Sequence, residues 1–243
     1  MVSKVEAAKR LLTLQEAGES FGAFCRLHHP QWKVPMFHHK LIEALDRLEK
    51  GTLLSDFNDE WAVIEHNHNN RNSPELQKTY TRPLETHTLH NVMINMPPRH
   101  SKSSYATQLF PSYYLARNPT RFSMTASYNS QLATDFGRQQ RLYLQHEETE
   151  MVFPDFALAK DSRAQDVFRT TEGGAAFNIG MGATTSGRPA TLLSIDDPIK
   201  SRKEADSATQ RQKAWDYYTS ALTTRLQPET TGQSPIQIVC YTR

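Results

Sequence analysis

One segment carries most of the information about the fold: Val92-Met93-Ile94-Asn95-Met96-Pro97-Pro98-Arg99-His100-Ser101-Lys102-Ser103. Its first five residues are mostly apolar and predict a short buried strand, and a helix is expected over 102–116. A strand, a loop and a helix in this order can bind phosphate, because backbone N–H groups and the positive end of the helix face the anion. In such a loop, Lys102 reaches the outer phosphates and Ser103 coordinates Mg²⁺.

The segment departs from the strict phosphate-loop pattern G-x-x-x-x-G-K-[ST]. Met96 stands at the first glycine position and Ser101 at the second. The segment alone is therefore also compatible with an ordinary loop-to-helix turn. If the position of Ser101 requires a positive φ, a serine there costs on the order of 1 kcal/mol and weakens ATP binding.

A second segment, Leu192-Leu193-Ser194-Ile195-Asp196-Asp197-Pro198, is an apolar strand that ends in two carboxylates. This is the form of a Walker B element, in which Asp196 holds Mg²⁺ and Asp197 orients the attacking water. Adjacent acidic residues after a strand also occur as plain turns. The two segments together favour a P-loop ATPase. They are expected on neighbouring parallel strands, with their functional residues at the carboxyl ends, where ligands bind.

The remaining pattern predicts an α/β fold with a mostly parallel central sheet flanked by helices, because strands alternate with helices. Further strands are expected at 122–126 and 236–240, and helices at 129–145 and 203–226. Residues 172–187 are rich in glycine and predict a hairpin and loops.

The N-terminal part predicts two helices, over 3–17 with Ser3 as cap and Gly18 as stop, and over 37–50. Residues 55–90 are polar and rich in Asn and His, which favours an insertion or mobile loop, with one short buried piece at 61–64. Within it, His66 and His68 have two interpretations, a metal site or solvated loop histidines.

Composition excludes several classes of protein. The chain has 243 residues, enough for one to two domains, and a net charge of +2, so any contact with nucleic acid needs a local patch. No apolar run reaches the ~18 residues of a membrane helix, and the first residues lack the apolar run of a signal peptide. The two cysteines, Cys25 and Cys240, predict reduced and buried thiols.

The order of these motifs resembles the large terminase subunits of tailed bacteriophages. The matching segments are 95–103, 126–133, 153–154, 173–174, 186–188, 195–200, 204–207, 215–218, 224–226 and 242–243. They cover most of the chain from about residue 28 onward, except 55–90. The resemblance implies a P-loop NTPase of the additional-strand catalytic-carboxylate type. It divides the chain into a helical, adenine-side segment (1–54), a polar insertion (55–90) and an ATPase core (91–243).

This resemblance also implies a function: a motor domain that hydrolyses ATP with Mg²⁺ and moves double-stranded DNA into a procapsid. The implied partners are the portal protein, the small terminase subunit and further copies in a ring, although the isolated domain is expected to be monomeric. No membrane partner is implied. The implied location is the host bacterial cytoplasm, with transient docking on the portal. The family's nuclease domain is expected beyond Arg243, so nuclease activity is not expected here.

Site residues are carried over position by position. Lys102 would hold the β- and γ-phosphates, Ser103 and Asp196 would bind Mg²⁺, and Asp197 would be the catalytic carboxylate. The expected phosphate loop comprises Pro98, Arg99, His100, Ser101, Lys102, Ser103 and Ser104, with Arg99 as a γ-phosphate sensor or a structural ion pair. Phe37, His38 and His39 would stack on or hydrogen-bond the adenine, or form a helix surface with one buried ring. Arg138 or Arg141 would act on a neighbour's ATP, or both are solvated arginines on a helix surface. Thr242 would link the ATP state to DNA movement.

Two alternatives to the motor remain open from the sequence. One is a catalytically weak module that binds the portal, the small subunit or DNA and whose P-loop is degenerate at Ser101. The other is a metal nuclease that uses Asp196 and Asp197. Two carboxylates without further convergent ligands are few for a two-metal site.

Overall fold

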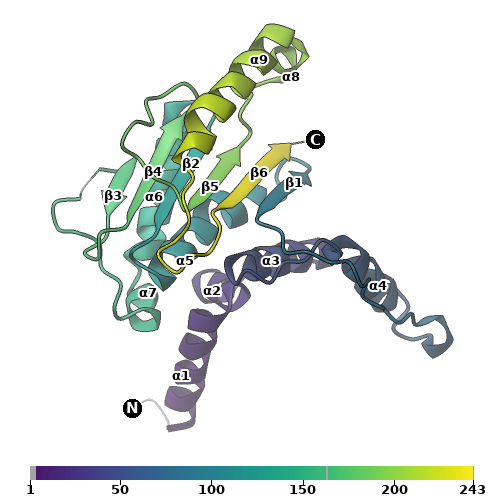
Figure 1. The fold of residues 1–243 in the computed structure, drawn as a ribbon. Helices are drawn as coiled ribbons and strands as arrows, with labels where there is room; N and C mark the ends of the chain where they lie inside the picture. Colours follow the sequence, from purple (N-terminus) through teal and green to yellow (C-terminus); the bar gives the residue numbers. More distant parts are fainter. Residues whose placement is uncertain (1–3, 163, 243) are drawn as a thin grey trace.

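A computed structural model describes residues 4–162 and 164–242 and shows an α/β fold around one sheet (Figure 1). Within these residues the sheet has six strands in the order β1-β6-β5-β2-β4-β3. Their bounds are β1 Asn91–Met96, β2 Phe122–Ser127, β3 Val167–Arg169, β4 Ala175–Gly180, β5 Leu192–Asp196 and β6 Ile236–Thr242. All neighbours pair in parallel except β3, which is antiparallel to β4. The expected mostly parallel sheet flanked by helices is thereby confirmed.

Helices precede the sheet and connect its strands. They are α1 Lys4–Glu19, α2 Phe21–His28, α3 Met36–Glu49, α4 Phe57–Asn69, α5 Phe110–Arg117, α6 Ser130–Leu144, α7 Glu147–Val152, α8 Arg202–Asp206 and α9 Ala208–Tyr217. Shorter helical turns are η1 Pro74–Leu76, the π-helical η2 Ser104–Leu109, the π-helical η3 Tyr218–Leu222 and η4 Thr223–Arg225. None of the described helices is both long and apolar enough to cross a membrane.

Apolar side chains cover both faces of the sheet, because successive residues of a strand point to opposite sides. On one face, Leu192 and Ile238 belong to the cluster that includes α2, α3 and η2. On the other face, Leu193 and Ile195 pack with Leu222 of η3. Both cysteines are free and buried, Cys25 in α2 and Cys240 in β6, as predicted. The inner strands β2, β4 and β5 are therefore shielded on both faces, whereas the edge strand β1 is partly exposed, with Met93 at 65%.

The expected order of the strands was wrong in one respect. β1 and β5 are not neighbours, because β6 lies between them and pairs in parallel with both. Ile236, Ile238 and Cys240 of β6 are fully buried, which suits a strand with partners on both sides. The apolar run predicted the strand correctly, but pairing between strands is not encoded in such a run.

The glycine-rich region 172–187 contains more regular structure than the predicted hairpin and loops. β3 and β4 do form an antiparallel pair, with a turn at Gly173, whose φ is +90°. However, β4 is a fully buried inner strand between β2 and β3. Small residues allow this, because a Cβ at Gly137 of α6 would lie 2.8 Å from the Asn178 amide nitrogen of β4. Close packing of α6 on β4 thus accompanies a strand in which Ile179 is the only β-branched residue.

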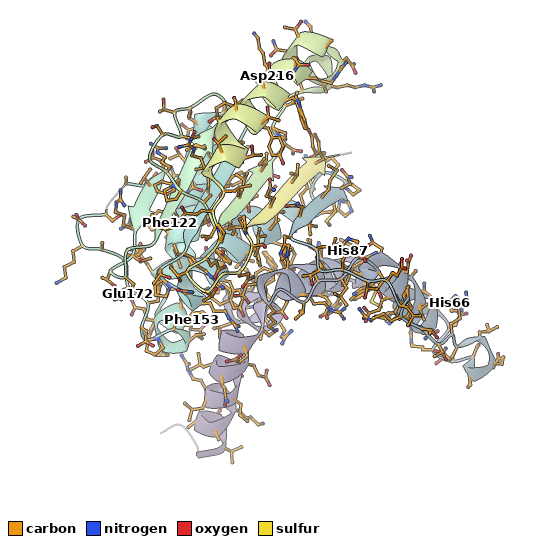
Figure 2. All side chains as sticks on the ribbon, in the orientation of Figure 1. His66, His87, Phe122, Phe153, Glu172 and Asp216 are labelled. Carbon is orange, nitrogen blue, oxygen red and sulfur yellow. The ribbon has the colours of Figure 1, made fainter. Side chains whose placement is uncertain are left out.

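Residues 55–90, which we call the arm, are not a loop. The arm contains α4 and an extended return segment, and Figure 1 shows it extending away from the sheet in a different direction from α1. Phe57 and Trp61 at its base are buried in the core, but Ala62 and Ile64 are exposed, so the buried piece expected over 61–64 is confirmed only at Trp61. Farther out, the Asn67 side chain bonds both the N–H and the carbonyl of Lys78. His66 lies toward the outer end of the arm and His87 nearer its base (Figure 2).

The other helices match the ranges expected from the sequence, except where an expected helix is divided into shorter ones. The helix expected over 203–226 is divided: α8 ends before Ser207, whose backbone is extended, and η3 and η4 follow α9. α1 continues past Gly18 to Glu19, and α2 follows it as a separate, unpredicted helix. The predicted cap Ser3 lies outside the described residues. The helices expected over 37–50, 102–116 and 129–145 are confirmed, the second with the π-helical turn η2 inside it.

Candidate functional site

Three adjacent strand ends bring the predicted site residues together. Lys102 follows β1, Thr242 ends β6, and Asp196 ends β5 with Asp197 directly after it. Because β1, β6 and β5 are parallel, their carboxyl ends lie at one edge of the sheet, where α/β folds bind ligands. The inserted strand β6 therefore adds Thr242 to the site and does not separate its halves.

Lys102 is the centre of this arrangement. Its Nζ donates to Asp197 Oδ2 at 2.8 Å and to Thr242 Oγ1 at 2.8 Å, and lies 3.5 Å from Asp196 Oδ1. Burial lowers the pKa of Lys102, but the hydrogen bond to Asp197 and the charges of both aspartates outweigh burial and raise the pKa. The buried ammonium is therefore charged.

Asp197 is held in a turn that few residues adopt. Its φ is +41°, and its N–H donates to the Cys240 carbonyl at 3.0 Å. This turn directs its carboxyl group to Thr242, whose N–H donates to Oδ1 at 2.7 Å. Burial raises the pKa of Asp197, but its bonds with Lys102 and Thr242 outweigh burial and lower the pKa. Asp197 is thus an ionised carboxylate that three donors from Lys102 and Thr242 orient.

For Asp196 the opposing effects on the pKa have the reverse outcome. It is 2% exposed, and burial raises its pKa even though Lys102 and Ser103 act to lower it. Ser103 Oγ donates to its Oδ2 at 2.7 Å, whereas its buried Oδ1 has no hydrogen-bond partner among the described residues. A buried carboxylate oxygen without a donor, beside a serine hydroxyl, fits Mg²⁺, which prefers oxygen ligands and is often held by one or two protein groups plus phosphate.

A metal site made by the protein alone is not present in the described part of the chain. These residues contain no group of three or more His, Cys, Asp and Glu that suits a metal ion. His66 of the possible histidine pair instead makes a hydrogen bond with the Leu76 carbonyl at 2.9 Å, within the arm. The donors at Asp196 therefore fit a metal ion that arrives with phosphate better than the two-metal site of a nuclease.

The loop between β1 and Lys102 is curled. Arg99 has φ +62° and Ser101 has φ +57°, so two left-handed residues lie within three positions. Left-handed turns of this kind gather backbone N–H groups into concave anion sites. The positive φ expected to strain Ser101 is confirmed, and it costs about 1 kcal/mol for a non-glycine residue.

The helix after the loop opens with a π turn that neighbouring side chains complete. The Tyr105 N–H donates to the Ser101 carbonyl at 3.1 Å, and η2 begins at Ser104. Gln140 Nε2 donates to the Thr107 carbonyl at 2.7 Å, and Ser194 Oγ donates to the Ala106 carbonyl at 3.3 Å. π turns are often found at functional sites. No pattern in the sequence points to Gln140 and Ser194 as supporting residues.

The three residues expected to contact adenine have different surroundings in the structure. Phe37 is 45% exposed, and its ring centroid lies 5.6 Å from that of His100. His38 is buried, and its Nε2 lies 2.8 Å from the His100 carbonyl. His39 is exposed and lies beside a small cavity that Trp32 also lines. α3 therefore brings Phe37 and His38 to the loop, and Phe37 also lines a groove of about 440 Å³ between α3 and β1.

The arginines do not join the carboxylates within this chain. Arg99 lies exposed in the curled loop. Arg138 contacts Gln165 at 3.2 Å and Asp135 at 3.5 Å, and Arg141 donates to the carbonyls of Ser162 and Ala164. Arg138 and Arg141 thus hold the segment that precedes β3.

No family model matches the chain, and no curated protein matches it. A functional assignment accordingly rests on the site itself and on the order of the motifs.

Proposed function

We propose that this chain is an ATPase motor domain that drives double-stranded DNA into a viral procapsid, as the resemblance to large terminase subunits implies. The observation that carries the proposal is the convergence of Lys102, Ser103, Asp196, Asp197 and Thr242 at three adjacent strand ends. A cation, a hydroxyl, a buried carboxylate and an oriented carboxylate are the groups that phosphoryl transfer to water requires.

In this proposal the triphosphate of ATP binds in the curled loop 97–101, at the start of the helix. Lys102 turns from Asp197 and Thr242 to the β- and γ-phosphates, and Asp197 is then free to orient the attacking water. Ser103 and Asp196 hold Mg²⁺, which supplies positive charge that stabilises the transferring phosphoryl group. Phe37, exposed beside His100, would stack on the base. When Lys102 leaves Thr242, the position of Thr242 changes, and this change is transmitted to β6 and β1.

The proposed partners follow from the same resemblance: double-stranded DNA, the portal, the small subunit and further copies in a ring, in the bacterial cytoplasm. A packaging motor moves any sequence, so its DNA contacts go mainly to phosphates and weaken with salt. A net charge of +2 is compatible with this role, because only residues that face the DNA need to be basic. Arg138 or Arg141 would act on a neighbour's ATP only after release from its present contacts.

The test is Mg²⁺-dependent ATP turnover, measured as phosphate release from the chain with DNA and portal. We expect Lys102→Ala and Asp197→Ala to abolish turnover, and Arg71→Ala, an exposed change on the arm, to leave it intact. A wild-type ring, assembled with DNA and portal, that releases no phosphate contradicts the motor.

A catalytically weak assembly module is the second candidate. It is favoured by one observation: the phosphate-binding lysine is already bound by two carboxylates and a threonine. Calorimetry with a non-hydrolysable ATP analogue separates the two functions. The motor binds the analogue more tightly with Mg²⁺, whereas the weak module shows no Mg²⁺-dependent binding.

A further inference from the structure

We propose that His38 is a positioning residue for the phosphate loop: its Nε2–H holds the carbonyl of His100, which orients the next N–H toward the phosphate. This inference rests on the proposed nucleotide site and gives His38 a role other than the adenine contact expected from the sequence.

The hydrogen bond defines the state of the His38 ring. Nε2 lies 2.8 Å from the His100 carbonyl oxygen, which can only accept, so Nε2 carries the hydrogen. Nδ1 is buried and has no hydrogen-bond partner among the described residues. His38 is 8% exposed, so solvent offers little replacement for this bond. Nε2 is therefore the ring nitrogen that donates to the loop.

The His38 ring is fixed by its surroundings. It lies against the Phe37 ring at 4.3 Å and the Tyr105 ring at 5.0 Å between centroids. Its backbone N–H donates to the Pro35 carbonyl at 2.9 Å in the first turn of α3, a helix anchored in the core by Leu41 and Leu45. The donor thus comes from a rigid helix far from the loop in sequence.

Because the peptide bond is planar, a fixed His100 carbonyl also fixes the direction of the Ser101 N–H. The His100 carbonyl and the Ser101 N–H belong to one planar trans peptide, so they point in opposite directions. A carbonyl held toward α3 therefore turns the Ser101 N–H away from α3. Ser101 has positive φ, and a flip of this peptide changes that angle and would relieve the strain at Ser101. The bond from His38 opposes the flip and keeps the N–H available to an anion.

The phosphate role and the adenine role predict different ligand dependence. If His38 orients the loop, its loss weakens binding of any polyphosphate, including one without a base. If His38 contacts adenine, its loss weakens binding of the nucleotide but leaves inorganic tripolyphosphate unaffected. Tripolyphosphate with Mg²⁺ is thus the deciding probe.

The experiment compares wild type, His38→Leu and His38→Gln by calorimetry with Mg²⁺-tripolyphosphate and with a Mg²⁺-bound non-hydrolysable ATP analogue. Leucine removes the donor, whereas the glutamine amide places a donor near the position of Nε2. We expect His38→Leu to weaken binding of both probes about tenfold, within the range of one hydrogen bond, and His38→Gln to restore most of it. His87→Leu, the same change at an exposed position of the arm, is the matched control and leaves both affinities unchanged (Figure 2).

The outcomes are distinguishable. If wild type binds neither probe, the nucleotide site itself is wrong. If wild type binds but folded His38→Leu binds tripolyphosphate equally well, the positioning role is wrong and the site stands. If His38→Leu does not fold, His38→Asn takes its place, because its shorter amide does not reach the carbonyl. Equal affinities of the Asn and Gln variants then overturn the inference.

Discussion

At Ser101 a side chain occupies backbone geometry that favours glycine, with φ at +57°. We expect Ser101→Gly to relieve this strain and tighten binding of the Mg²⁺-bound ATP analogue. The gain in folding free energy is at most about 1 kcal/mol, because glycine also loses more entropy on folding. Urea unfolding and calorimetry on the same preparation measure both effects.

The matched control is Ser104→Gly, the same change three residues later. Ser104 is the first residue of η2, where glycine is unfavourable, so this variant is expected to lose about 1 kcal/mol. A Ser101→Gly variant that is destabilised as much as Ser104→Gly would show that the left-handed turn imposes no strain. Ser101→Gly is thus expected to raise the affinity for the nucleotide analogue and, to a small extent, the stability of the fold.

At the level of elements, the site was more predictable than the sheet around it. Lys102 and Asp196 were found because each follows an apolar run that ends in a loop, a local pattern. The position of β6 was not found, because strand order depends on pairing between distant segments. β4 is hard to predict because small and polar residues separate its two large apolar side chains, Phe177 and Ile179. The role of His38 was missed because its partner is a backbone carbonyl, which leaves no mark in the sequence.

The arm contains a helix although its polar composition favours a loop. Its helix α4 is anchored only at its base, by Phe57 and Trp61, whereas its outer part is exposed. We expect replacement of residues 68–76 by a short Gly-Ser turn to change the unfolding free energy by less than about 0.5 kcal/mol. Trp61→Ala is expected to lower it by about 3 kcal/mol, since it empties part of the core. Chemical unfolding of both variants tests this contrast, and equal losses would mean that the outer arm is part of the folding unit.

For the molecule as a whole, a cluster of histidines joins the N-terminal helix α2 to helices α6 and α7. His28 of α2 lies 3.0 Å from Thr149 Oγ1 of α7, and its ring lies near those of Tyr143 and His146. His29 bonds the Tyr143 hydroxyl at 2.8 Å. Burial first, and the charges of His146 and His29 next, lower the pKa of His28 to about 4. Folding therefore opposes protonation of this ring.

This predicts stability that falls in acid. Between pH 6.5 and 4 the unfolded chain binds a proton at His28 that the folded chain does not, so protons favour unfolding. The unfolding free energy is expected to drop by up to about 3 kcal/mol over this range from His28 alone. His28→Gln keeps a donor for Thr149 and removes the titration, so its stability should fall less steeply. Urea unfolding at several pH values makes the comparison, and parallel curves for the two proteins would exclude His28 as the cause.

The burial of both native thiols has a practical consequence. Cys25 is 3% exposed and Cys240 is fully buried, and burial raises the pKa of each. Maleimide dyes react with exposed thiolates, so the folded chain offers them no native target. A single cysteine introduced at the outer arm or on α9 becomes the one position that such a dye labels. Fluorescence measurements of how the arm moves relative to its neighbours can therefore begin from the wild-type sequence, without first replacing its cysteines.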